Sequence, residues 1–577
     1  MREDAARPAA GGLVRVPRWA YWAVTILSLL LGAEAVVRGT RTVLTVADSD
    51  LTNFFLPSAS YILRGDPWHM YAARGVGLIA NDSPPLSMFL YAPLLALARA
   101  VGFAANYGQV ITFVSLPFIV VVPLLGLLVL AALRRLYPQM PDTQQFLAYV
   151  LVVLSPLVWL AIGSWYHPEQ PLMVCFVVGA AIALQGRREW LAGLLAGLAL
   201  LTSTTAMFPL LALGLLPLLE RRWRVTAIFG GVAIVVAGIG MAPFFLFDRP
   251  DTTYSFLTWR GGAEIGGNSI WTVFASSSAT GIRHTVNAIA KRLDTPSMLI
   301  FVAVVSVLAV RRLRVSVYSR DVWAVMALAA LAVPMLSKRV WPYYYLEPFI
   351  FLLVWEFSTM HDRLAGLWRW PVLSVGFLVV AATLAQYVGL QSVGALDRIV
   401  LGLLEFGSML AFVAAIWMRM RAAKPDVSPG PAVPAAGDPR MALSAAGGRM
   451  PLPDPAAVAS AQPLRPGGGQ RPAPGPAPAP QSVWMGGERM PQMPDQGQMP
   501  VQPVQPAPPP RGYPGAYPAS PQPQPQVLPG SDGAPGRMPP RPPEGWRGGP
   551  PRTNGAGANG AGMGWPASPE NGGRGYR

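Results

Sequence analysis

Residues 225–247 read VTAIFGGVAIVVAGIGMAPFFLF, an apolar stretch without a single charged side chain. A helix needs about 20 apolar residues to cross the hydrocarbon core of a bilayer, and this stretch is long enough. Three arginines precede it, in the sequence Arg221-Arg222-Trp223-Arg224. Because cytoplasmic loops of membrane proteins carry an excess of Arg and Lys, the stretch predicts a membrane-spanning helix that begins at the cytoplasmic face.

Similar apolar runs recur through the first 424 residues. They cover residues 19–37, 110–133, 146–162, 168–185, 190–203, 205–219, 298–310, 322–337, 342–358, 371–390 and 399–418. Hydrophobic residues make up 52% of the chain and charged residues only 13%, about half the charged share of an ordinary soluble domain. The sequence therefore excludes a soluble globular enzyme and predicts an all-α polytopic membrane protein with about 12 transmembrane helices and a set of outer-face interfacial helices.

Positive charge predicts the orientation of these helices. Arginine clusters follow every second run, at residues 134–135, 187–188, 221–224, 311–314, 363–369 and 419–421. With residues 1–18 as a cytoplasmic N-terminus, all of them fall on the cytoplasmic face. This agreement requires that the run 84–104 is an interfacial or re-entrant helix; as a further crossing it would place nearly all of the clusters outside. The large polar and aromatic loops then lie on the extracytoplasmic face, where we expect any active site.

The last part of the chain, residues 425–577, is dominated by Pro, Ala, Gly and Gln. Such a composition cannot bury enough apolar surface to offset chain entropy, so we expect a disordered, Pro-rich cytoplasmic tail. It is either a dispensable extension or a docking segment for cytoplasmic partners. The expected organisation is thus a transmembrane catalytic domain at 19–424, with a first outer loop and its interfacial helices at 38–109, followed by this tail.

The first outer loop carries two carboxylates, Asp48 and Asp50, soon after the first run. A carboxylate there can act as a general base on a hydroxyl group; the alternative is a pair of solvated loop charges. The apolar residues after Asp50 predict a short surface helix that ends at Gly65. Downstream, prolines at residues 84–85 and at Pro93 are expected to open and close an apolar helix.

A second outer turn contains His167 and Glu169 beside a predicted span. His167 could contact a phosphate while Glu169 orients the imidazole; the alternative is a local contact that caps the loop. Cys175 is the one cysteine and the chain has four histidines. This excludes a disulfide framework and a Cys-based zinc site, and a multi-histidine metal centre is not expected.

The remaining candidates are cations and sugar-binding groups on the outer loops. Arginine contacts phosphate oxygens in a bidentate manner, an amide beside a stacking ring can bind a sugar, and cations outside the membrane indicate a bound anion. The candidates for the donor phosphate are Arg249, Arg260, Lys338, Arg339 and His167, and those for the substrate are Glu169, Asn268, Trp271, Tyr344 and Tyr345. For residues 338–345 the alternative is an aromatic belt with snorkelling cations.

The order of these motifs along residues 19–418 resembles the GT-C superfamily of glycosyltransferases. The likeness rests on Asp50-Leu51 with the phenylalanines 54–55, on Gly65-Asp66-Pro67-Trp68, on the proline-bounded helix at 84–93, on Asn268-Ser269-Ile270 and on Tyr343-Tyr344-Tyr345-Leu346. Within GT-C it is most similar to the family 87 mannosyl- and arabinofuranosyltransferases of actinobacterial envelope assembly. The His-Pro-Glu sequence at 167–169 departs from that family.

The resemblance implies an inverting enzyme in the plasma membrane that takes mannose or arabinofuranose from a polyprenyl-phosphate sugar. The acceptor would be a lipid or a cell-envelope glycan, and an outer-loop acid, Asp50 or failing that Asp48, would be the base. No cofactor is implied; a divalent cation could bind at Asp48 and Asp50 but is not claimed. Membrane lipids are expected partners and nucleic acid is not. The alternatives are a polytopic transporter or lipid flippase, and a noncatalytic envelope scaffold.

Overall fold

The computed structural model describes residues 15–43, 50–73, 80–259, 265–275, 280–360, 370–387 and 395–422. These residues are almost entirely helical. In chain order the elements are α1 (Arg18–Val43), η1 (Leu51–Phe55), α2 (Leu56–Leu63), η2 (Pro67–Ala72), α3 (Pro85–Ala100), α4 (Tyr107–Ser115), η4 (Leu116–Val120), α5 (Val121–Leu136), α6 (Asp142–Val153), α7 (Pro156–Trp159), η5 (Leu160–Ser164), α8 (Glu169–Gln185), α9 (Glu189–Thr202), η6 (Thr204–Ala206), α10 (Met207–Leu219), α11 (Trp223–Phe247), α12 (Arg249–Thr253), η7 (Tyr254–Trp259), β1 (Gly266–Gly267), α14 (Ile270–Ala275), α15 (Thr280–Leu313), α16 (Val322–Ala330), α17 (Ala332–Leu336), β2 (Arg339–Val340), η8 (Pro342–Tyr345), α18 (Leu346–Thr359), α19 (Val372–Tyr387) and α20 (Ala395–Ala422).

The described residues confirm an all-α polytopic chain. Six helical segments are long and apolar enough to cross a membrane: Arg18–Gly39, Gly108–Leu136, Asp142–Ser164, Trp223–Phe247, Ile282–Leu313 and Leu396–Ala422. Shorter apolar helices lie at Pro85–Ala100, Glu169–Gln185, Glu189–Thr202, Thr204–Leu219, Val322–Leu336 and Val372–Gln386. Each apolar run of the sequence is mostly helical over its described residues, as its composition predicted, although the runs 146–162 and 322–337 are each divided into more than one helix.

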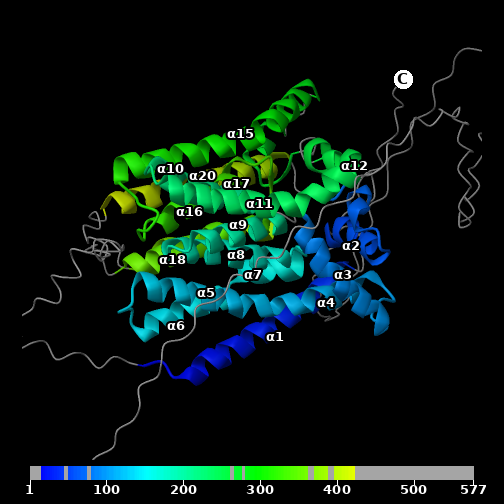
Figure 1. Cartoon of the computed structure of the whole chain (residues 1–577), viewed down its shortest axis with the longest axis horizontal. Coiled ribbons are helices and arrows are strands. Elements are labelled where there is room, and N and C mark those ends of the chain that lie inside the picture. The colour runs from blue at the N-terminus through cyan, green and yellow to red at the C-terminus, as the bar shows by residue number, and fades with distance from the viewer. Residues whose placement is uncertain are drawn as a thin grey trace, which may run out of the picture. The chain divides into compact units, whose positions relative to one another are not determined.

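The long helices of the bundle lie side by side, and the short elements of the first outer loop gather at one end of them (Figure 1). Helix α9 packs against both α8 and α11, while α2 packs on α3 and on η2. A separate apolar cluster, which includes Leu51, Phe55, Met70, Tyr91 and Tyr166, lies beneath α2 and η2. Burial of these side chains holds η1, α2 and η2 against α3.

Two helix boundaries differ from the sequence expectations. Pro93 does not close its helix, because α3 continues through it to Ala100. The residues after Pro93 keep an apolar face, and Leu95 and Ala98 are buried, so tertiary packing compensates for the one backbone hydrogen bond that proline removes. The expected outer loop between residues 248 and 297 is also more ordered, since α15 begins at Thr280 and runs continuously to Leu313.

A two-residue bridge ties the loop before α14 to the end of α17. Strand β1 pairs in parallel with β2, and the amide of Gly266 donates to the carbonyl of Lys338 at 3.0 Å. Gly267 has a φ of +65°, and a Cβ at this position would lie 1.9 Å from the carbonyl oxygen of Val340. The close approach of these two segments therefore requires glycine at position 267.

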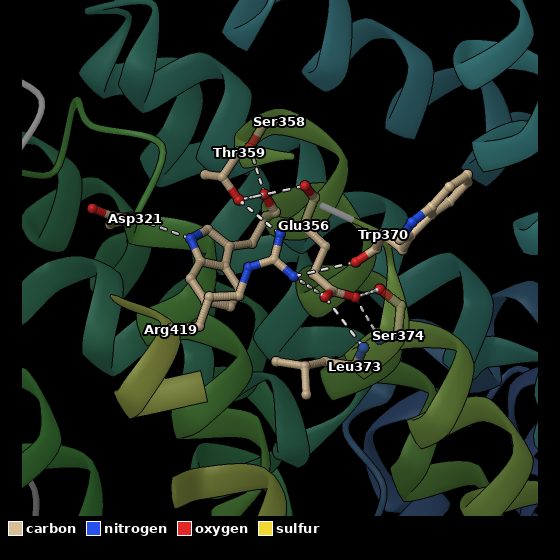
Figure 2. A network of polar contacts seen from close by, with 9 residues as sticks. Asp321, Glu356, Ser358, Thr359, Trp370, Leu373, Ser374 and Arg419 are labelled. Carbon is tan, nitrogen blue, oxygen red and sulfur yellow. Dashed lines mark hydrogen bonds and ion pairs between the residues drawn. The ribbon is translucent and has the colours of Figure 1, made fainter. Parts of the chain in front are cut away.

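A buried ion pair joins three helices at the end of α18 that lies away from Tyr345 (Figure 2). The Arg419 guanidinium of α20 contacts the Glu356 carboxylate of α18, and both side chains are fully buried. Glu356 also accepts from the backbone amide of Ser374 on α19, at 2.5 Å. The sequence predicted Arg419 as part of a basic cytoplasmic cluster, and that side of the membrane stays a prediction. In the fold the charge of Arg419 is neutralised inside the bundle, because burying a cation requires a partner of opposite charge.

The expected Pro-rich tail at 425–577 and most of the N-terminal segment 1–18 lie outside the described residues.

Candidate active site

Asp50 lies where the sequence predicted an acid at the start of a surface helix. It precedes η1, which leads into α2, and α2 ends at Leu63 with Gly65 in a left-handed conformation at φ +81°. The predicted helix and its glycine end are therefore confirmed. Leu51 and Phe55 are buried in the apolar cluster, whereas the Asp50 side chain keeps 43% of its surface exposed. The fold thus anchors the loop and leaves this carboxylate open.

His167 approaches Asp50 from the turn between η5 and α8. The residue before it, Tyr166, has a φ of 53°, a strained conformation for a bulky residue that the surrounding packing must enforce. The imidazole is buried between the ring of Tyr343, at a centroid distance of 3.9 Å, and the edge-on ring of Phe55, at 5.5 Å. Packing from both sides fixes the orientation of the imidazole.

Four polar side chains form a continuous hydrogen-bonded chain through this imidazole. Nε2 of His167 lies 2.9 Å from Oδ2 of Asp50, and Nδ1 lies 2.7 Å from Oε1 of Glu169. The hydroxyl of Tyr91, on α3, donates to the other oxygen of Glu169 at 2.6 Å. We call this set the Asp50–Tyr91 chain. It joins the start of η1, the middle of α3 and the start of α8, three segments that are separate in the sequence.

Electrostatics determine the charge of the imidazole. Burial disfavours the imidazolium, but the charges of Glu169 and Asp50 and the hydrogen bonds to both outweigh it and raise the pKa of His167 to about 10. His167 is therefore protonated at neutral pH and donates through both nitrogens. It acts as a charged orienting group for Asp50 and not as a free base. The sequence left open whether Glu169 orients His167 or only caps the loop; the two side chains are in contact, and the orienting role stays a prediction.

The cations predicted to bind the donor phosphate differ in burial. Lys338 is buried, and its ammonium lies 4.0 Å from Oδ2 of Asp294 on α15. Arg339 is half-buried in β2, and Arg249 is exposed at the start of α12. Arg260 and the second candidate base, Asp48, lie outside the described residues. A donor-phosphate role for these residues remains a prediction.

The predicted sugar-binding residues separate into two groups. Tyr344 packs edge-on against Tyr343 and so adjoins the Asp50–Tyr91 chain. Tyr345 turns the other way, is fully buried and donates to Glu405 of α20 at 2.6 Å. Trp271 donates its indole N–H to the carbonyl of Leu336 at 2.9 Å, and Asn268 donates to the carbonyl of Leu384 at 3.4 Å. In this structure these three hold helices together.

Sequence reasoning missed two members of the site. Tyr91 was not among the candidate site residues, and Tyr343 was passed over in favour of its two neighbours, Tyr344 and Tyr345. The signal for Tyr91 was present in its position on an apolar helix that also carries Ser87, because residues four apart share a face of a helix. For Tyr343 no local signal distinguishes it from Tyr344 or Tyr345, since only the start of α18 decides which ring meets His167.

A resident metal ion has no evident place among the described residues. They contain no group of three His, Cys, Asp or Glu side chains arranged to hold one.

Comparison with known proteins gives little further information. No protein-family model matches the chain, and no curated protein matches it. Among solved structures, the chain is similar to the crystal structure of ArnT from Cupriavidus metallidurans bound to undecaprenyl phosphate. The identity is 14%, the match covers 70% of this chain and 77% of that chain, and the TM-score is 0.38.

Proposed function

We propose that this chain is a membrane glycosyltransferase with Asp50 as its general base. It transfers a sugar, mannose or arabinofuranose, from a polyprenyl-phosphate donor to a lipid or cell-envelope glycan on the extracytoplasmic face. The observation that carries the proposal is the exposed Asp50 carboxylate, oriented by a buried imidazolium at one end of a bundle of membrane-spanning length. An oriented carboxylate open to solvent on one side is what removal of a proton from a hydroxyl group requires.

The proposed reaction is a single displacement with inversion. Oδ2 of Asp50 is held by His167, and Oδ1 accepts the proton of the acceptor hydroxyl as its oxygen attacks the anomeric carbon. A new carbon–oxygen bond forms, the bond from that carbon to the phosphate oxygen breaks, and the lipid phosphate leaves with the electron pair. Arg249, Arg260, Lys338 or Arg339 neutralises the phosphate.

The organisation proposed from the sequence accompanies this function. Residues 19–424 form the catalytic membrane domain, the site faces the extracytoplasmic side, and residues 425–577 form a cytoplasmic tail. Support for this sidedness comes from the arginine clusters, because they follow every second predicted span.

The test is transfer by the purified protein, with radiolabelled polyprenyl-phosphate mannose and arabinose as donors and a lipid extract as acceptor. Replacement of Asp50 by Asn keeps the shape of the side chain and removes the base, so we expect transfer to fall by about 10²- to 10⁴-fold. Asp66→Asn is the matched control, since Asp66 lies on the same loop and its carboxylate hydrogen-bonds to the exposed His69 at 2.6 Å. Wild-type turnover in Asp50→Asn would refute the assignment of the base.

The purified protein also tests the two alternatives, a transporter or lipid flippase and a noncatalytic scaffold. Uptake or lipid transbilayer movement in proteoliposomes, without any glycosyl transfer, would replace the proposal by a transporter or flippase. Deletion of residues 425–577 is expected to leave transfer largely intact, whereas a scaffold that works through its tail would lose its function.

A further inference from the structure

A second chain of hydrogen bonds lies beside the Asp50–Tyr91 chain and has no role in the mechanism above. Its members are Gln170, Ser203, Thr205 and Glu347. We call it the Gln170–Glu347 chain. It connects the first turn of α8, the turn between α9 and α10, and the first turn of α18. All four side chains are buried, but each keeps between 4% and 6% of its surface exposed.

The two chains share the same structural supports. Gln170 directly follows Glu169, and the backbone amide of Gln170 donates to the backbone carbonyl of His167 at 3.0 Å. On α3, Tyr91 bonds to Glu169 while Ser87, one turn earlier, donates to the carbonyl of Thr202 at 3.0 Å. On η8, just before α18, the ring of Tyr343 packs against His167, and Glu347 lies one turn further on, in the first turn of α18. Only the first turn of α8 has a member in both chains. α3 and residues 343–347 each carry a member of one chain and a side chain that packs beside the other, which places the second chain next to the first.

The hydrogen bonds of the second chain run in one direction. The side-chain amide of Gln170 donates to Oγ of Ser203 at 3.0 Å, and Oγ1 of Thr205 donates to Oε1 of Glu347 at 2.6 Å. Because the Thr205 proton is used in that bond, the 3.1 Å contact between the two hydroxyls must take its proton from Ser203. Every hydroxyl proton in the chain is therefore engaged.

The groups left open in this chain are acceptors. No described residue donates to Oε1 of Gln170 or to Oε2 of Glu347, and each of the two residues keeps 4% of its surface exposed. Among the described residues Glu347 has no ion-pair partner; it is supported by one hydroxyl and by its place in the first turn of α18. A desolvated carboxylate gains strongly from a further hydrogen-bond donor. A molecule rich in hydroxyl groups supplies such donors.

We propose that the Gln170–Glu347 chain is a subsite for sugar hydroxyl groups beside Asp50. This inference rests on the proposed function, because it assigns the sugar of either the donor or the acceptor to this chain. Hydroxyls of that sugar donate to Oε2 of Glu347 and to Oε1 of Gln170, and so position the ring while Asp50 removes the acceptor proton. The four members are positioning residues for substrate and take no part in proton transfer.

The first experiment uses Glu347→Gln, which keeps the oxygen that Thr205 contacts but turns the open acceptor into a donor. We expect KM to rise by about 10- to 100-fold for one of the two substrates, with kcat changed much less. A rise in the donor KM assigns the donor sugar, and a rise in the acceptor KM assigns the acceptor. Glu220→Gln is the matched control, since Glu220 follows the opposite end of α10 and accepts from the amide of Val317.

A second pair of variants guards against a purely structural effect. Thr205→Val removes the hydroxyl link and is expected to raise the same KM, while Thr205→Ser keeps the hydroxyl and restores it to near the wild-type value. If Glu347→Gln and Thr205→Val lower thermal stability or kcat but leave both KM values unchanged, the chain only joins helices and the subsite is refuted.

A binding measurement separates failure of the subsite from failure of the proposed function. The probes are polyprenyl-phosphate mannose and arabinose, sugar-free polyprenyl phosphate, and the methyl glycosides of both sugars. The subsite requires that wild-type protein binds at least one sugar-bearing probe, and that Glu347→Gln weakens this binding more than that of sugar-free lipid. Absence of this difference overturns the subsite even in an active enzyme. A clear difference without any transfer overturns the glycosyltransferase and leaves a sugar-binding site.

Discussion

Replacement of His167 by Gln tests the electrostatic design of the Asp50–Tyr91 chain. Glutamine keeps hydrogen-bonding capacity but not the positive charge that lies between Asp50 and Glu169, at 2.9 and 2.7 Å. The folded protein raises the pKa of His167 from 6.5 to about 10. Since each pKa unit corresponds to about 1.4 kcal/mol, the interaction is at most on the order of 5 kcal/mol. Water screens the half-exposed Asp50, so we expect a loss of about 2–3 kcal/mol.

The sign of the pH dependence follows from the raised pKa. A group with a folded-state pKa above its unfolded value stabilises the protein fully below the unfolded pKa, here near 6.5, and this contribution is lost as the pH rises through about 10. Wild-type protein should therefore exceed His167→Gln in apparent Tm by several degrees at pH 6. The difference should become small near pH 9.5.

Thermal unfolding in detergent, followed by intrinsic tryptophan fluorescence, to which the fully buried Trp323 and Trp355 contribute, measures this difference. His69→Gln is the matched control: His69 also contacts a carboxylate, Asp66 at 2.6 Å, but it is exposed, and its replacement should have little effect at either pH. A difference between wild type and His167→Gln that is the same at pH 6 and pH 9.5, or that is absent at both, would refute the charged imidazole.

Two further predictions concern stability. Arg419→Met leaves the carboxylate of Glu356 buried without its cation. This should lower the free energy of unfolding by about 3–5 kcal/mol, measured as a lower apparent Tm. The double replacement Glu356→Leu with Arg419→Met should recover most of the lost stability. If the single variant unfolds at the wild-type temperature, the ion pair is not the link we describe. Gly267→Ala places a methyl group against the carbonyl of Val340 and should speed hydrogen exchange at the Gly266 amide at least tenfold, the loss of about 1.4 kcal/mol. Gly266→Ala, with 3.7 Å of clearance to its nearest neighbour, should change the exchange much less, and equal effects would argue against the close contact.

The amino-acid sequence by itself determined the membrane class, the helical runs and the position of the acid at Asp50. These features depend on local composition: a long apolar run must be helical in a bilayer because its backbone groups have no other partner there. The helix that begins after Asp50 and ends at Gly65 was likewise predictable from a short stretch of local sequence. His167 and Glu169 are also close in the sequence, two residues apart, so a contact between their side chains could be expected from local sequence alone.

The tertiary structure alone decided which distant groups meet. His167 bonds to Asp50 across 117 residues, and Thr205 bonds to Glu347 across 142. No periodicity or spacing encodes such pairs, because they depend on how α3, α8 and α18 pack. The same holds for Arg419: the sequence predicted it as a member of a cytoplasmic arginine cluster but did not indicate its partner, Glu356. Charge patterns in sequence predict the side of a membrane, whereas burial and pairing are properties of the folded bundle.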